Sequence, residues 1–281
     1  MNKTRWTSLL RCSEVKQVSD SWRVYDVELH SRLFLGTAQY PSPTIMQEAI
    51  EASGAQVLTT SLRRQSPDSG GGQKWWQQLR ELNRQILPNT AGCSNAKEAV
   101  TLANMARELF QTNWIKLEIT GDDYNLQPNT LELLIATEQL QNDGFNVFAY
   151  TTEDLVVCKR LRDFGCQVIM PWGAPIGTGK GLLNPYALKT LRARMPEVSL
   201  LVDAGIGLPS HVAQVMELGF DGVLLNTSIA RSDNPVQMAT AMRHACKAGR
   251  LAYLSGAISE RETADASTPI IGTPFWQSKK K

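Results

Sequence analysis

Four segments of the chain end a helical pattern with a glycine and then enter a short apolar run. They read EASGAQVLTT, QNDGFNVFAY, RDFGCQVIMP and MELGFDGVLL, with Gly54, Gly144, Gly165 and Gly219 at the matching place. A glycine just past the last helical turn adopts the positive φ that ends many helices. An apolar run without alternation is typical of a strand that is buried on both faces of a parallel sheet. The repeat therefore predicts alternating helices and parallel strands.

The same repeat extends over most of the chain. Further apolar runs lie between the four segments, so the sequence predicts eight strands, each followed by a helix. This is the pattern of an α/β protein of the (β/α)8 TIM-barrel type, and 281 residues suit one such domain. A doubly wound open sheet is the alternative, but the near-even spacing favours closure. The strands are expected to begin near Leu33, Gln56, Ile86, Trp114, Asn146, Gln167, Ser199 and Gly222.

Two of the intervening helices have clear sequence signals. One is predicted to start at Pro235, behind the capping sequence SDN, and to run toward Gly249. The other lies in NAKEAVTLANMARELF, where apolar residues recur at helical spacing. Its apolar face is expected to contain Ala99, Leu102, Ala103, Ala106, Leu109 and Phe110.

The segment WRVYDVELHSRL precedes the first barrel strand and alternates in polarity. Its alternation predicts a β-hairpin or an extra strand that caps one end of the barrel. The two faces would be Val24, Asp26 and Glu28 against Tyr25, Val27 and Leu29. We expect residues 1–20 to be an extension without a clear pattern, 21–270 to be the barrel domain and 271–281 to be a tail.

Composition excludes several classes of protein. The net charge is +2, from 29 basic and 27 acidic residues, which gives no electrostatic reason to expect nucleic-acid or membrane binding. No apolar run approaches the roughly 18 residues of a transmembrane helix, and the start lacks the apolar stretch of a secretory signal. The five cysteines form no C-x-x-C pair, and the three histidines have no metal-ligand spacing. A cytoplasmic protein without a metal site is therefore expected.

Loops rich in glycine and small polar residues follow the last three predicted strands. In barrels of this type the loops after the strands form the active site, and those after strands seven and eight often bind phosphate. Glycines let backbone N–H groups approach an anion closely. Tight turns between elements are the alternative explanation, and GAPIGTGKG does not match a Walker A loop. The three loops read MPWGAPIGTGKG, VDAGIG and LLNTSIA.

A lysine and a glutamate share one face of the fourth strand, WIKLEIT. Residues two apart on a strand point to the same side, so Lys116 and Glu118 lie together. A lysine in a dry pocket is expected to have a lowered pKa and to act as a nucleophile toward a carbonyl, with Glu118 moving protons. The alternative is a buried ion pair that closes a core layer. Asp203, at the end of the seventh strand, adds a carboxylate, or else only starts a turn.

These residues lie in motifs that resemble a known family. The chain resembles bacterial thiazole synthase, the ThiG family of thiamine biosynthesis, from about Ser31 to Pro269. Taken together and in this order, the motifs are highly specific. They are LPNTAG, NWIKLEI, MPWGAPIG, VDAGIGLPSH and GVLLNTSIA.

The resemblance implies a transferase reaction that condenses 1-deoxy-D-xylulose 5-phosphate, dehydroglycine and sulfur into the thiazole phosphate carboxylate. The sulfur would arrive as a thiocarboxylate on a small ubiquitin-like carrier protein. The resemblance implies no metal or bound organic cofactor, and it implies a homo-oligomer, expected to be a tetramer. The family's Schiff-base lysine falls on Lys116 and its proton-transfer carboxylates on Glu118 and Asp203. Its sugar-phosphate contacts fall on Gly177, Ala204, Gly205, Asn226 and Thr227.

The first barrel strand departs from the family pattern. It ends LGTAQY, where the family commonly has Gly-Lys in place of Ala38 and Gln39, which leaves open a different substrate preference or partner surface. The alternatives to thiazole synthesis are another Schiff-base enzyme acting on a sugar phosphate, such as an aldolase, and a non-catalytic docking protein. The source of dehydroglycine, either a flavin glycine oxidase or a radical tyrosine lyase, stays open.

Overall fold

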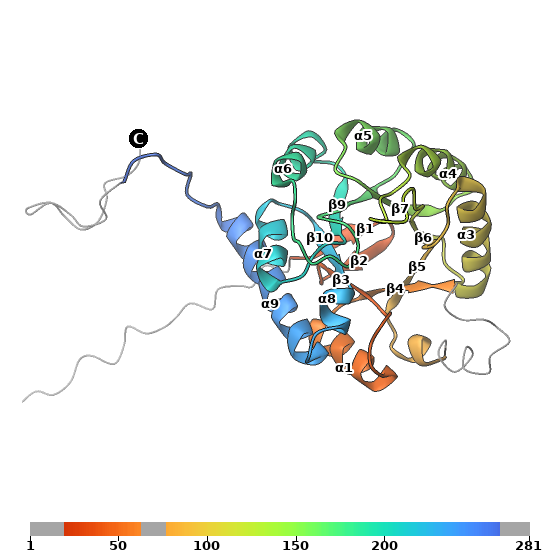
Figure 1. Cartoon of the computed structure of the whole chain (residues 1–281), viewed down its shortest axis with the longest axis horizontal. Helices are drawn as coiled ribbons and strands as arrows, with labels where there is room; N and C mark the ends of the chain where they lie inside the picture. The colour runs from red at the N-terminus through yellow and green to blue at the C-terminus, as the bar shows by residue number, and fades with distance from the viewer. Residues whose placement is uncertain (1–19, 63–76, 265–281) are drawn as a thin grey trace, which may run out of the picture.

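The chain folds into a closed parallel barrel. The computed structural model describes residues 20–62 and 77–264, and the predictions for residues 1–19 and 265–281 lie outside these ranges. Eight parallel strands close in the order β10-β3-β4-β5-β6-β7-β8-β9 (Figure 1). Each begins within one residue of its predicted start, which confirms the barrel. The strands are β3 (Leu33–Gly36), β4 (Val57–Ser61), β5 (Gln85–Asn89), β6 (Trp114–Leu117), β7 (Asn146–Thr151), β8 (Val168–Pro171), β9 (Ser199–Asp203) and β10 (Gly222–Leu225).

Helices form a ring outside the barrel (Figure 1). The four glycines of the repeat all have positive φ, between 65° and 98°, as the helix-ending role requires. Among the described residues, no helix combines the length and apolar character needed to cross a membrane. The helices are α1 (Pro43–Ser53), α3 (Ala96–Phe110), α4 (Thr130–Asn142), α5 (Leu155–Asp163), α6 (Pro185–Arg194), α7 (Pro209–Glu217), α8 (Thr227–Ala230) and α9 (Pro235–Ser255).

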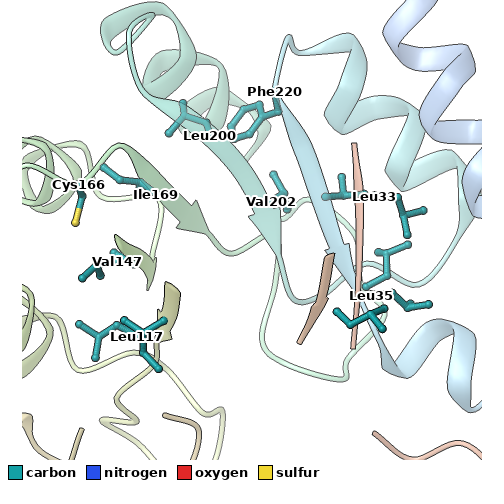
Figure 2. Packing of buried hydrophobic residues seen from close by; sticks show 14 of the residues in the cluster. Leu33, Leu35, Leu117, Val147, Cys166, Ile169, Leu200, Val202 and Phe220 are labelled. Atoms are coloured by element: carbon teal, nitrogen blue, oxygen red, sulfur yellow. The ribbon is translucent and has the colours of Figure 1, made fainter. Parts of the chain in front are cut away.

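The main hydrophobic core lies between the strands and this ring of helices. Figure 2 shows alternate residues of β3 and β9, among them Leu33, Leu35, Leu200 and Val202, packing on this outer side of the barrel. All four are buried. Because the outer side is filled in this way, the other residues of each strand must point into the barrel.

Two details of the predicted helices are wrong. Leu109 is 40% exposed, because α3 faces the barrel with its small residues, including Ala99 and Ala103, and so lies close to the strands. Helix α9 continues past Gly249 to Ser255. Gly249 lies inside the helix where α7 passes, and a Cβ there would be 2.8 Å from that of Met216. The glycine therefore allows close helix packing rather than ending the helix.

A hairpin closes the end of the barrel at which the strands begin. Strands β1 (Trp22–Val24) and β2 (Val27–Leu29) pair antiparallel, as predicted. The expected faces are wrong, because a turn at residues 25–26 reverses the alternation and places Val24 and Leu29 on the same buried face. This face packs on inward residues of the barrel such as Phe34, Trp114 and Phe148. The open end is therefore the one where the strands finish.

Candidate active site

A cavity of about 540 Å³ opens at the carboxyl end of the barrel strands. Loops that follow β3, β8, β9 and β10 contribute to its wall, together with inward residues of β4, β5 and β6. This is the end at which barrel enzymes bind their substrates. Lys116, Glu118 and Asp203 all line this cavity.

Lys116 lies between two carboxylates at the base of the cavity. Its Nζ is 3.3 Å from Oε2 of Glu118 and forms a closer ion pair with Oδ2 of Asp203. The exposed fractions are only 6% for Lys116, 8% for Glu118 and 4% for Asp203. We call these three residues the charged triad. The ion pair considered from the sequence is present, and it lies in the cavity wall rather than in a closed core layer.

Local contacts fix the backbone of the triad. Lys116 is an inward residue of β6, level with Asn89 of β5 and Phe148 of β7. The backbone N–H of Glu118 donates to Oγ1 of Thr90 at 2.9 Å, and the same hydroxyl donates to the carbonyl of Glu118 at 2.8 Å. The sequence did not single out Thr90, because this bond depends on where the loop after β5 ends. Asp203 is the last residue of β9, and its carboxylate pairs with Lys116 rather than with the following turn.

The charged triad reverses the expected shift in the pKa of Lys116. Burial alone favours the neutral amine, but the attraction of Asp203 and then of Glu118 outweighs it and raises the pKa above the ordinary 10.5. The expectation of a lowered pKa is therefore wrong, because it did not include the attraction between Lys116 and Asp203. Without substrate the lysine is an ammonium, so an attack on a carbonyl first requires proton transfer to a neighbouring base.

Tyr150 of β7 lies next to the charged triad and was also not identified from the sequence. The Nζ of Lys116 is 5.0 Å from the centroid of its ring, within the range of a cation–π interaction. The residue is 1% exposed. The available signal was the alternation in NVFAYT, which places Phe148 and Tyr150 on the same inward face.

The three loops after β8, β9 and β10 meet at the same cavity. Gly177, Ala204, Gly205, Asn226 and Thr227 all line it. Ala204 and Gly205 both have positive φ, 69° and 77°, which turns the chain sharply after Asp203. The loops are in close contact, since a Cβ on Gly207 would lie 2.6 Å from the carbonyl oxygen of Gly179. Such glycine-rich backbone presents N–H groups to a bound anion, and α8 begins directly after Asn226.

The departure from the family pattern also lies at the cavity. Ala38 and Gln39 both line it, and Gln39 has a positive φ of 69° although it is not a glycine. The side chain of Gln39 is exposed at the rim, away from the buried triad. Within the described ranges, no three His, Cys, Asp or Glu side chains are grouped closely enough to hold a metal ion.

The burial of the triad leads to a prediction about stability. The variant Lys116→Met leaves two buried carboxylates unpaired, which typically costs about 3–5 kcal/mol of unfolding free energy. Urea unfolding at a series of pH values measures this loss, with the exposed Lys189→Met as the control.

The stability that Lys116 contributes to the wild type should be lost at high pH. A lysine whose pKa is raised in the folded state stabilises the protein fully below 10.5, and this contribution is lost as the pH rises through the raised value. Adding Asp203→Asn to Lys116→Met should restore part of the stability. If Lys116→Met has the same unfolding free energy as the control at every pH, the ion pairs of the triad do not contribute to stability.

Comparison with known proteins identifies the family. The family described as "Thiazole biosynthesis protein ThiG" matches residues 23–269. The chain is 57% identical over 270 residues to the thiazole synthase of Ralstonia pickettii (strain 12J), covering 96% of this chain and 98% of the relative. It is 56% identical to the thiazole synthase of Cupriavidus taiwanensis, covering 92% and 94%.

Solved structures agree with the fold. A chain in the crystal structure of the Amycolatopsis orientalis BexX/CysO complex superposes with a TM-score of 0.77 at 28% identity, covering 86% of this chain and 98% of that one. The 3-hexulose-6-phosphate synthase from Salmonella typhimurium, at 14% identity and a TM-score of 0.55, is similar in fold alone. The chain therefore belongs to the ThiG family of thiazole biosynthesis proteins, and its activity is that of a thiazole synthase.

Proposed function

We propose that the chain makes the thiazole from 1-deoxy-D-xylulose 5-phosphate, dehydroglycine and sulfur, through an imine on Lys116. The observation that carries this proposal is a buried amine, set between two carboxylates, in the wall of an open cavity. An amine and two bases in contact are the groups that imine chemistry requires.

The first step is attack on the sugar. A carboxylate of the charged triad takes a proton from the ammonium of Lys116, and the free amine attacks the ketone carbon. Water leaves, and a carbon–nitrogen double bond replaces the carbon–oxygen one. The closer of the two ion pairs is with Asp203, which supports this residue as the first base.

The later steps are proton transfers. The imine makes the neighbouring C–H acidic, so a carboxylate can remove that proton and return it elsewhere, which shifts the carbonyl character to the next carbon. The thiocarboxylate sulfur of the carrier then adds to this carbon. Glu118 and Asp203 both lie within ion-pair distance of Lys116 and can serve as these bases.

The phosphate of the sugar would bind at the loops after β8, β9 and β10, against Gly177, Ala204, Gly205, Asn226 and Thr227. Two features support this assignment. The five residues line the same cavity as the triad, and the backbone there turns through two successive positive φ values at Ala204 and Gly205. A sugar phosphate could then lie across the cavity, with its ketone toward Lys116.

The proposal includes a protein partner that delivers sulfur. The hairpin closes one end of the barrel, so the carrier's C-terminus would enter at the open carboxyl end. The BexX/CysO structure, in which a similar fold occurs in a complex of two proteins, supports a protein partner. A homotetramer, and contact with an enzyme that supplies dehydroglycine, remain parts of the same proposal.

Borohydride reduction tests the imine directly. After incubation with 1-deoxy-D-xylulose 5-phosphate and reduction, the wild type should gain the mass of the reduced sugar on the peptide that carries WIKLEI. Lys116→Arg should fold and bind the sugar phosphate yet gain no mass, because a guanidinium cannot supply a free amine near neutral pH. Lys180→Arg is the control, since this exposed lysine lies in the sixth loop. If the reduced sugar were found on Lys180 in place of Lys116, the assignment of Lys116 as the imine-forming residue would be wrong.

Asp203→Asn separates the imine from the proton transfers that follow it. The variant should still form the adduct, with Glu118 as the remaining base for Lys116. Exchange of the acidified C–H with deuterium from the solvent should slow by about 10²- to 10⁴-fold, the usual loss for one general acid or base. Mass spectrometry of the sugar phosphate measures this without any partner protein. Asp163→Asn, on the exposed side of α5, is the control. Unchanged exchange in Asp203→Asn would remove this residue from the mechanism.

A further inference from the structure

Tyr150 lies inside the barrel, level with the charged triad. Leu117 pairs with Ala149 between β6 and β7, so Tyr150 is level with Glu118. On its other side it pairs with Met170 of β8. The ring has the Nζ of Lys116 at 5.0 Å from its centroid, and the residue does not line the cavity itself. Tyr150 therefore contacts the triad but does not line the cavity in which the substrate would bind.

The hydroxyl of Tyr150 has no hydrogen-bond partner among the described residues, although it is fully buried. A buried hydroxyl without a partner costs free energy that a phenylalanine would avoid. The same strand uses Phe148 two residues earlier, on the same inward face, in the apolar half of the barrel. The hydroxyl is thus present only at the level of the triad.

Burial, followed by the charges of Asp203 and Glu118, raises the pKa of Tyr150. The side chain is therefore a neutral phenol that can donate a proton in a hydrogen bond but does not lose it. The triad itself holds two carboxylates and one ammonium. When Lys116 gives its proton to one carboxylate and bonds to the sugar, the other carboxylate loses its charged donor.

We infer that Tyr150 is a positioning residue. Its ring holds the nitrogen of Lys116, and its hydroxyl donates a hydrogen bond to the carboxylate that loses the ammonium as its donor. This inference rests on the proposed imine. The hydroxyl would donate its hydrogen bond only after the imine has formed, when the carboxylates must stay aligned for the proton transfers. The ring acts earlier, through its attraction for the positively charged nitrogen.

The test compares Tyr150→Phe with the wild type in three measurements. The variant should unfold at the same temperature or higher, because it loses only an unpartnered hydroxyl. Its borohydride-trapped adduct should stay within about twofold of the wild type. Deuterium exchange into the bound sugar should fall about 10- to 100-fold, in kcat rather than KM, as expected for one lost hydrogen bond to a charged group.

Tyr25→Phe is the matched control, since the hydroxyl of Tyr25 donates to the carbonyl of Val147 at 2.6 Å and lies at the closed end of the barrel. It should lower the unfolding temperature and leave the exchange rate unchanged. Tyr150→Leu, which removes the ring as well, should also reduce adduct formation.

Two outcomes overturn the inference while leaving the imine in place. One is an exchange rate in Tyr150→Phe equal to that of the wild type. The other is a lower exchange rate in Tyr150→Phe together with an unfolding temperature so low that part of the variant is unfolded in the assay. Normal adduct formation in Tyr150→Leu would refute the role of the ring. Absence of an adduct in the wild type itself would instead refute the proposed imine.

Discussion

The structure depends on holding one ammonium and two carboxylates together in a cavity wall that water barely reaches. Lys116, Glu118 and Asp203 are each less than a tenth exposed. Burying any one of them alone would be strongly unfavourable, so each requires the other two. This mutual requirement explains why the lysine is charged without substrate, and why the groups that must exchange protons with it are already in contact.

Barrel closure makes this arrangement possible. Strands β6 and β9 are separated by β7 and β8, so in a flat sheet they would lie about 14 Å apart, three strand spacings. Curvature turns their inward side chains toward a common axis, and Lys116 reaches Asp203 across the interior. The hairpin fills the opposite end with Trp22, Val24 and Leu29, which confines the polar groups to the open end.

The strands and the three loops could be predicted because their signals are local. A glycine with positive φ after four of the helices, such as Gly54 or Gly219, indicates where the next strand begins. Features that depend on contacts across the barrel could not be predicted. The sign of the Lys116 pKa shift required Asp203 and Glu118 together, the role of Tyr150 required its distance from Lys116, and the faces of the hairpin depended on a turn at residues 25–26.

The central claim is that one sugar phosphate spans the cavity from Lys116 to the loops after β8, β9 and β10. A crystal structure of the protein, reduced with borohydride in the presence of 1-deoxy-D-xylulose 5-phosphate, tests both ends at once. We expect a covalent bond from Nζ of Lys116 to the former ketone carbon, with the phosphate against Gly177, Gly205 and Asn226. A sugar bonded to another lysine, or a phosphate bound away from these loops, would contradict the account.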